Sequence, residues 1–256
     1  MLQLRRGDIA PRALIYIGQL SPCEITSSPD GWCIDALTTY RQLMDHGQLG
    51  RSLSAITDAA TTVGGWQTQS VGTLGGNVCN ASPAADLVAP LLIHDAVVQL
   101  DSLKSPAARM SLEEFIVGRR KTRCSPDQLL TSISLTSMPL NSGDGYFKVG
   151  RRSGMEVAIV GLAVRLTLAA DLTTIADIRI AACAAGPTPF RARAAENALI
   201  NSAPTPAAIA AAGAMLVACA RPIDDRRASA RYRIAVLPRL LGHAIRQIVA
   251  KIATQS

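Results

Sequence analysis

The chain has 256 residues, a mass of 26.9 kDa and a formal net charge of +7. Hydrophobic residues make up 48% of it and charged residues 18%, which excludes global disorder and allows one or two domains. Mean hydropathy is +0.22, but the longest apolar run, residues 157–170, is too short for a membrane span of about 20 residues and contains Arg165. The N-terminus, MLQLRRGDIAP, lacks the apolar core of a secretory signal, so we expect a cytoplasmic protein without a transmembrane segment.

The cysteines and histidines show no metal-binding spacing. No CxxC pair occurs among the six cysteines, which predicts free thiols and no metal site. The three histidines lie far apart in the sequence, and His94, in the apolar stretch LLIHDA, is typical of a core residue.

Most of the positive charge lies near the C-terminus. From Arg221 onward the sequence has eight basic residues against Asp224 and Asp225, an excess of six. Such a segment can bind nucleic acid, but no helix-turn-helix spacing or zinc finger accompanies it and aromatic residues are only 4% of the chain. We therefore expect no nucleic-acid partner, and interpret the segment as a solvated helix face or a protein-docking surface.

The first half of the chain alternates short strand-like runs with helical patterns. Strands are predicted at residues 13–17, 31–36, 97–100 and 129–135. Helices are predicted at 38–46, with Thr38 or Thr39 as N-cap, and at 54–63, 86–94 and 112–117. Ser111 caps the last of these, with Glu113 and Glu114 in its first turn.

The loop PLNSGDG, residues 139–145, is the best domain boundary, and it divides the chain into domains 1–138 and 144–256. Strands are then predicted at 146–149, 157–168 and 175–182, and helices at 192–200, 206–219 and 237–252. Strands followed by helices predict an α+β second domain with a three-stranded antiparallel sheet.

The most informative segment is VGTLGGNVCNASPAAD, residues 71–86. Glycines allow positive φ and leave amides uncovered, so several N–H groups could converge on an anion, with Thr73, Asn77 and Ser82 adding hydrogen bonds. The same composition also fits a tight turn, and local composition leaves both interpretations open. The segment is neither a GxxxxGK[ST] loop nor a GxGxxG fingerprint, so mononucleotide-binding and Rossmann sites have no support.

TLGGN (73–77), followed by ASPAAD (81–86) and an apolar helix, strongly resembles the second flavin-binding stretch of the FAD subunits of molybdenum hydroxylases. This family includes xanthine dehydrogenases, carbon monoxide dehydrogenases and bacterial N-heterocycle dehydrogenases. Further family-like motifs follow in order over nearly the whole chain: ALTTY (36–40), FIVGRRKT (115–122), PDQLL (126–130), YFKVGRR (146–152), GPTPFRA (186–192) and DDRRASARYR (224–233).

The resemblance implies a fold of two domains. The first is an FAD-binding domain of the vanillyl-alcohol-oxidase/xanthine-dehydrogenase (PCMH) type, and the second is a smaller domain similar to the C-terminal domain of carbon monoxide dehydrogenase flavoproteins. Two departures stand out: QTQS (67–70) replaces the family's Q-I-R-N, and the family's first flavin loop, of the form GGT-D/S-L, precedes the segment that residues 2–7 resemble. The first domain is therefore expected to be N-terminally shortened and to bind FAD more weakly.

The resemblance also implies the flavin contacts. Those around the diphosphate fall on Thr73, Leu74, Gly75, Gly76 and Asn77. Asp86 takes the place of a family carboxylate that contacts the cofactor, and Cys124 lies where a contact is made near the isoalloxazine. Lys148 takes the place of a family lysine whose charge would favour a negatively charged reduced ring. Without the resemblance, Lys148 would be interpreted as an exposed strand lysine and Asp86 as a helix-terminal acid.

The resemblance implies an oxidoreductase subunit that does not contact the organic substrate. Molybdopterin is expected on a large partner subunit and 2Fe-2S clusters on a small one, in a heterotrimer that could pair into a dimer of heterotrimers. The flavin would pass electrons to NAD, oxygen or another acceptor, and no catalytic residue or metal ligand is expected in this chain. Two alternatives remain: a flavin-free structural subunit of such a complex, or a stand-alone flavoprotein oxidase with a related FAD fold.

Overall fold

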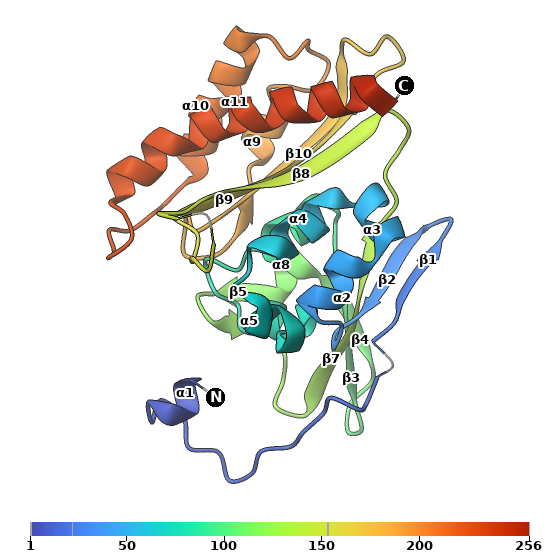
Figure 1. The fold of residues 1–256 in the computed structure, drawn as a ribbon, viewed down its shortest axis with the longest axis vertical. Coiled ribbons are helices and arrows are strands. Elements are labelled where there is room, and N and C mark those ends of the chain that lie inside the picture. The colour runs from blue at the N-terminus through green and yellow to red at the C-terminus, as the bar shows by residue number, and fades with distance from the viewer. Residues whose placement is uncertain (1, 22, 153, 256) are drawn as a thin grey trace.

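The structure is a computed structural model that describes residues 2–21, 23–152 and 154–255 (Figure 1). Two sheets and two sets of helices alternate in layers. Helices between the sheets contact both of them, and the long C-terminal helix covers the outer face of the second sheet. The N-terminal sheet contributes to one cluster of buried apolar side chains, and the C-terminal sheet contributes one face to that cluster and the other face to a second.

The N-terminal part contains a five-stranded sheet with the order β1-β2-β7-β3-β4 in the described residues. Its strands are β1 (Ile25–Ser28), β2 (Gly31–Asp35), β3 (Val97–Ser102), β4 (Ala108–Ser111) and β7 (Gln128–Thr136). All neighbours are antiparallel, and Ile34, Ile133 and Val98 lie side by side across the three middle strands. Because side chains alternate along a strand, this register places one apolar face against the helices.

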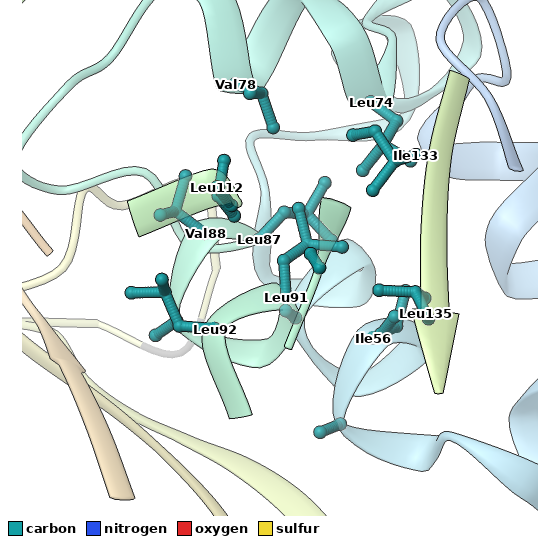
Figure 2. Packing of buried hydrophobic residues seen from close by; sticks show 14 of the residues in the cluster. Ile56, Leu74, Val78, Leu87, Val88, Leu91, Leu92, Leu112, Ile133 and Leu135 are labelled. Atoms are coloured by element: carbon teal, nitrogen blue, oxygen red, sulfur yellow. The ribbon is translucent and has the colours of Figure 1, made fainter. Parts of the chain in front are cut away.

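Short helices cover that apolar face. They are α2 (Tyr40–Asp45), α3 (Gly47–Ser52), α4 (Ser54–Thr62), α5 (Trp66–Val71), α6 (Leu74–Cys79), α7 (Val88–Ile93) and α8 (Leu112–Phe115). Thr39 and Ser111 both form capping boxes, which confirms the predicted helix starts there. Figure 2 shows Leu74 and Val78 of α6 pointing into the same cluster as Leu87 and Leu91.

The C-terminal part has a four-stranded sheet of order β11-β10-β9-β8, rather than the three strands predicted. Its strands are β8 (Ser142–Val149), β9 (Val160–Leu168), β10 (Ile175–Cys183) and the two-residue β11 (Phe190–Arg191). A two-residue strand has no periodicity for a sequence pattern to show. Every residue of β9 is buried, because α4 and α7 contact this sheet from one side and α11 from the other. Arg165, within β9, pairs with Asp177 at 3.0 Å.

Three helices complete this part: α9 (Arg193–Asn197), α10 (Pro206–Cys219) and α11 (Ala230–Gln255). The bounds of α10 match the prediction, but α11 begins seven residues before the predicted Leu237 and contains Pro238. A proline inside a helix removes one backbone hydrogen bond. Here it lies against Gly213 of α10, where a Cβ would come within 2.9 Å of Pro238 Cβ, so the close helix contact accommodates the ring.

A buried carboxylate joins the two parts of the molecule. Asp144 of β8 is 2% exposed and accepts hydrogen bonds from the amides of Ser54 and Ala55, both at 3.0 Å, and from Ser54 Oγ at 2.7 Å. It thus caps α4, whose own N-cap, Leu53, supplies no side-chain bond. His94 Nε2 lies 2.9 Å from Asp144 Oδ2, in agreement with the expectation of a core histidine.

Three other predicted elements differ from those in the structure. Residues 13–17 form no strand: Leu14, Ile15 and Tyr16 are exposed and pair with no other strand among the described residues (the N-terminal segment in Figure 1, which includes α1, Leu2–Arg5). The helix predicted at 112–117 ends at Phe115, and β5 (Ile116–Gly118) then pairs with β6 (Lys121–Thr122). Residues 142–145 belong to β8 rather than to a loop, because they pair with residues 164–167 of β9.

Candidate functional site

The centre of the candidate site is the short helix α6, which contains most of TLGGN. Thr73 is its N-cap and accepts a hydrogen bond from the Gly76 amide at 3.0 Å. Thr73 also forms an isolated antiparallel bridge with Thr39. Leu74 and Val78 are fully buried, so the core fixes the inner side of the helix.

The first amides of α6 are bonded within the chain. Leu74 N donates to Thr38 O at 2.9 Å, Gly75 N to Ala36 O at 2.7 Å and Asn77 N to Thr73 O at 3.0 Å. With the Gly76 amide on Thr73 Oγ1, each of these four N–H groups has an acceptor. The predicted set of free, converging amides is therefore absent from residues 74–77 as the structure describes them.

The glycines serve close packing rather than positive φ. A Cβ at Gly75 would lie 2.7 Å from Ala36 Cβ, and one at Gly72 would lie 2.6 Å from the Tyr40 ring. Neither of them has positive φ, and nor does Gly76. Gly76 is exposed, and a Cβ there would approach only Thr73 Oγ1, at 2.9 Å. The outer side of α6 thus presents bare backbone at Gly76, where a bound group can come close.

Asn77 has one atom without a partner. Its Nδ2 donates to the Tyr40 hydroxyl at 3.2 Å, whereas its Oδ1 is buried and has no hydrogen bond among the described residues. Leaving a buried amide oxygen without a hydrogen bond costs free energy. Because this oxygen lies beside an exposed glycine, a polar ligand bound here would supply the missing hydrogen bond. Burial raises the pKa of Tyr40, and the carboxylate of Asp86 nearby adds to the increase.

Asp86 and Lys148 meet at the junction between the two parts. Asp86, which precedes α7, is 6% exposed, and its Oδ2 accepts from Lys148 Nζ at 2.9 Å. Its Oδ1 accepts from the Tyr146 hydroxyl at 2.6 Å. Burial raises the pKa of Asp86, although the charge of Lys148 and both hydrogen bonds oppose the increase. Lys148 Nζ also donates to Thr62 O at 2.8 Å, so Lys148 is not the exposed strand lysine of the simpler interpretation.

Sequence reasoning missed three of these neighbours: Tyr40, Tyr146 and Cys183. The Tyr146 hydroxyl oxygen lies 3.4 Å from Cys183 Sγ, and burial raises the pKa of that thiol to about 12. Tyr146 could have been found, because residues two apart on a strand share a face and Lys148 was already a candidate. Tyr40 and Cys183 come from distant segments, and only the packing brings them here.

Cys124 lies apart from the acid–lysine pair. It lies near Cys79, at the last turn of α6. Burial raises the pKa of Cys79 to about 11, and the Cys124 thiol adds to the increase. The Arg120 amide of the β5–β6 hairpin donates to Ala81 O at 2.9 Å, which holds this region against the end of α6. In the described part of the chain no hydrogen bond or ion pair links Cys124 to Asp86 or Lys148.

Family comparisons account for almost the whole chain. Residues 1–137 match the model of the FAD binding domain in molybdopterin dehydrogenase, and residues 145–248 match the CO dehydrogenase flavoprotein C-terminal domain. The chain therefore belongs to the family of FAD-binding subunits of molybdenum hydroxylases, a family of oxidoreductase subunits, which confirms the resemblance and the predicted fold class.

Two curated relatives and one solved structure are similar to the chain over most of its length. The chain is 28% identical to the xanthine dehydrogenase FAD-binding subunit of Escherichia coli O157:H7, over 98% of this chain and 86% of the relative. It is 30% identical to the 6-hydroxypseudooxynicotine dehydrogenase complex subunit alpha of Paenarthrobacter nicotinovorans, over 89% and 76%. Among solved structures, reconstituted CO dehydrogenase from Oligotropha carboxidovorans superposes with a TM-score of 0.84 at 26% identity, covering 89% of this chain and 78% of that one.

Two kinds of feature are absent from the described residues. No described helix is long and apolar enough to cross a membrane. Nor do three or more histidine, cysteine or carboxylate side chains gather into a candidate metal site within residues 2–21, 23–152 and 154–255.

Proposed function

We propose that this chain holds FAD along the outer side of α6. Thr73, Gly76 and Asn77 would contact the diphosphate and its surroundings, with Leu74 and Gly75 buried directly behind them and Asp86, Cys124 and Lys148 further along the cofactor. The observation that carries the proposal is the unpaired, buried Oδ1 of Asn77 beside the bare backbone of Gly76. An amide at this place can bond a hydroxyl or, after rotation, a phosphate oxygen.

FAD, when bound, supplies redox chemistry that can join one-electron and two-electron partners. The chain's place in the complex would be between 2Fe-2S clusters on a small subunit and an acceptor such as NAD or oxygen, with molybdopterin on a large subunit. The names of relatives support this arrangement, since they describe FAD-binding subunits, medium chains and members of dehydrogenase complexes.

The chain's own residues would set the electrostatics of the site. Lys148 is held between Asp86 Oδ2 and Thr62 O, so its ammonium group is fixed in place. Because Asp86 Oδ2 lies 2.9 Å from Lys148 Nζ, the carboxylate offsets the charge of the ammonium group. The net field on a flavin ring bound nearby would therefore be smaller than that of a lone cation. Tyr146 orients the same carboxylate from the other side.

A flavin-free structural subunit is the second candidate, because the four amides of residues 74–77 already have acceptors within the chain. The two candidates differ in the visible spectrum of the complex purified with its partner subunits. Flavin absorbance in proportion to this chain supports the first, and its absence supports the second.

The variant Gly76→Val tests which residues hold the cofactor. A branched side chain there would cover the exposed backbone, so we expect the complex to assemble but lose most of its flavin. Gly76→Ala is the matched control, because it adds only the Cβ, which approaches Thr73 Oγ1 alone. Full flavin content in Gly76→Val would show that α6 is not the binding element.

A further inference from the structure

The exposed side of α11 carries a row of arginines. Arg231, Arg239 and Arg246 follow at spacings of eight and seven residues, so they project from one side of the helix. All three are exposed, and the opposite side, with Leu241 and Ile245, is buried against the sheet. Figure 1 shows α11 running along the side of the C-terminal sheet that faces away from the helices between the two sheets.

These arginines have no counter-ions among the described residues. The sequence from residue 198 to the end contains only two acids, and both are engaged. Asp225 pairs with Arg227 and Arg233, and Asp224 accepts from the Ala230 amide at the start of α11. Within the described residues, Arg231, Arg239 and Arg246 form no ion pair or hydrogen bond.

Some exposed arginines elsewhere are paired, as Arg193 is with Glu113 and Arg151 with Glu156, whereas Arg51 and Arg109 form no ion pair among the described residues. What distinguishes the row is that three unpaired arginines lie along one side of a single helix. A row of three unpaired arginines on a helix without acids therefore creates a local positive potential that favours an acidic partner.

We propose that this row, with Tyr232 of the same helix and Ile223 of the segment before it, docks an acidic surface of another subunit of the complex; the inference rests on the proposed function. Arginine binds carboxylates in a bidentate way, which suits a protein partner. Tyr232 and Ile223, 48% and 63% exposed, offer apolar contacts of the kind that protein interfaces enrich. At about 1.5 Å per residue, Arg231 to Arg246 spans about 22 Å, comparable to the width of an interface that buries about 800 Å² per partner.

A membrane fits this surface less well. A helix that lies on a bilayer inserts an apolar face, but the apolar stripe of α11 already packs against β8 and β9. Nucleic acid also fits poorly, since the sequence has few aromatic residues and no recognition motif.

The test is co-expression with the large and small subunits of the complex, followed by measurement of the dissociation constant at rising salt. The triple variant Arg231→Glu/Arg239→Glu/Arg246→Glu should bind at least about tenfold more weakly at low salt. Wild-type affinity should fall between about 50 and about 300 mM salt, and the variant should lose most of this dependence.

Two matched variants separate charge from position. Arg231→Lys/Arg239→Lys/Arg246→Lys keeps the charge and should stay within a few-fold of wild type. Arg6→Glu/Arg12→Glu/Arg51→Glu changes the net charge equally at exposed arginines elsewhere and should bind like wild type. Circular dichroism and thermal midpoints check that every variant is folded.

Several results would overturn the docking proposal. They are unchanged affinity in the Glu triple, equal loss in the Arg6/Arg12/Arg51 control, and no association of the wild-type chain with the two subunits. Arginine-dependent binding to anionic phospholipid vesicles or to DNA, without an effect on subunit affinity, would also overturn it. Flavin content, measured on the same samples, reports separately on the proposed function, because a flavin-free complex can still depend on the arginine row.

Discussion

Asp86 and Asp144 are two buried aspartates at the same junction, and their surroundings shift their pKa values in opposite directions. Asp86 has two donors, Tyr146 and Lys148, and burial raises its pKa. Burial also acts on Asp144, but the hydrogen bond and charge of His94, with the donors at Ser54 and Ala55, lower its pKa below the ordinary value. The number and alignment of donors, rather than burial alone, decide the sign.

The comparison separates a structural carboxylate from one suited to a site. Asp144 accepts two amides at the start of α4, so its charge is stabilised by a helix terminus as well as by His94. Asp86 is held instead by two side-chain donors, the Tyr146 hydroxyl and the Lys148 ammonium group. A group of that kind, near Tyr40 and Asn77, is a reasonable contact for a cofactor.

The largest expected effect is that of Asp144→Ala. The substitution leaves His94 and the amides of Ser54 and Ala55 without their acceptor, and so removes the cap of α4 from across the junction. We expect the free energy of unfolding to fall by about 3–5 kcal/mol, as measured by urea denaturation of the full chain. Asp144→Asn, which keeps the shape and one acceptor oxygen, should cost less. A loss below about 1 kcal/mol in the alanine variant would show that Asp144 does not hold the junction.

The next effect is that of Lys148→Met, expected to cost about 2–3 kcal/mol in the same assay. The loss is smaller than for Asp144→Ala because Asp86 keeps the Tyr146 hydroxyl as a donor, whereas Asp144→Ala leaves several donors without their acceptor. In the assembled complex, the reduction potential of bound flavin should fall by about 30 mV, which for two electrons is about 1.4 kcal/mol.

Lys148→Arg is the control for that variant, because it retains a cation able to bond Asp86. It should keep the potential near that of wild type even if stability changes. An unchanged potential in Lys148→Met would leave Lys148 with a purely structural role at the junction.

A smaller effect, about 1–2 kcal/mol, is expected for Tyr146→Phe. The change removes the 2.6 Å donor to Asp86 Oδ1 and keeps the ring in its buried position. Because one of the two donors is lost, the pKa of Asp86 should rise further, which carboxyl infrared or NMR titration of the labelled side chain can measure. If the pKa of Asp86 stays unchanged, Lys148 alone governs it.

Much of the framework could be predicted from the sequence. The fully buried β9 follows from an apolar run, and the capping boxes at Thr39 and Ser111 follow from their residue types. Residues 13–17 have a strand pattern but no partner strand in the described structure, and periodicity carries no information about partners. The fourth strand, β11, is too short for any pattern.

Part of the candidate site could be predicted from the sequence, but its contacts could not. The motifs pointed to Asp86 and Lys148, yet their ion pair depends on how β8 packs against the segment before α7. The glycines of TLGGN were expected to allow positive φ and to leave the backbone uncovered. Neither has positive φ. Gly76 does leave its backbone exposed, whereas Gly75 serves a close tertiary approach to Ala36. The same holds for the amides of α6, whose acceptors at Ala36 and Thr38 lie more than thirty residues away in the sequence.

The smallest expected effect is a pair of opposite pH dependences. The folded-state pKa of Asp144 is lowered, so its contribution to stability is present above the unfolded pKa, near about 4, and is lost as the pH falls through the folded pKa. The folded-state pKa of Asp86 is raised, so the folded state binds the carboxyl proton more tightly than the unfolded state does. The contribution of Asp86 to the free energy of unfolding therefore declines as the pH rises from about 4 through the folded pKa. Urea denaturation of wild type, Asp144→Asn and Asp86→Asn from about pH 7 to about pH 3 measures both. As the pH falls, the advantage of wild type over Asp144→Asn should shrink, while its stability relative to Asp86→Asn should improve. Parallel curves for the two variants would show that both carboxylates meet the same environment, against the difference in their donors.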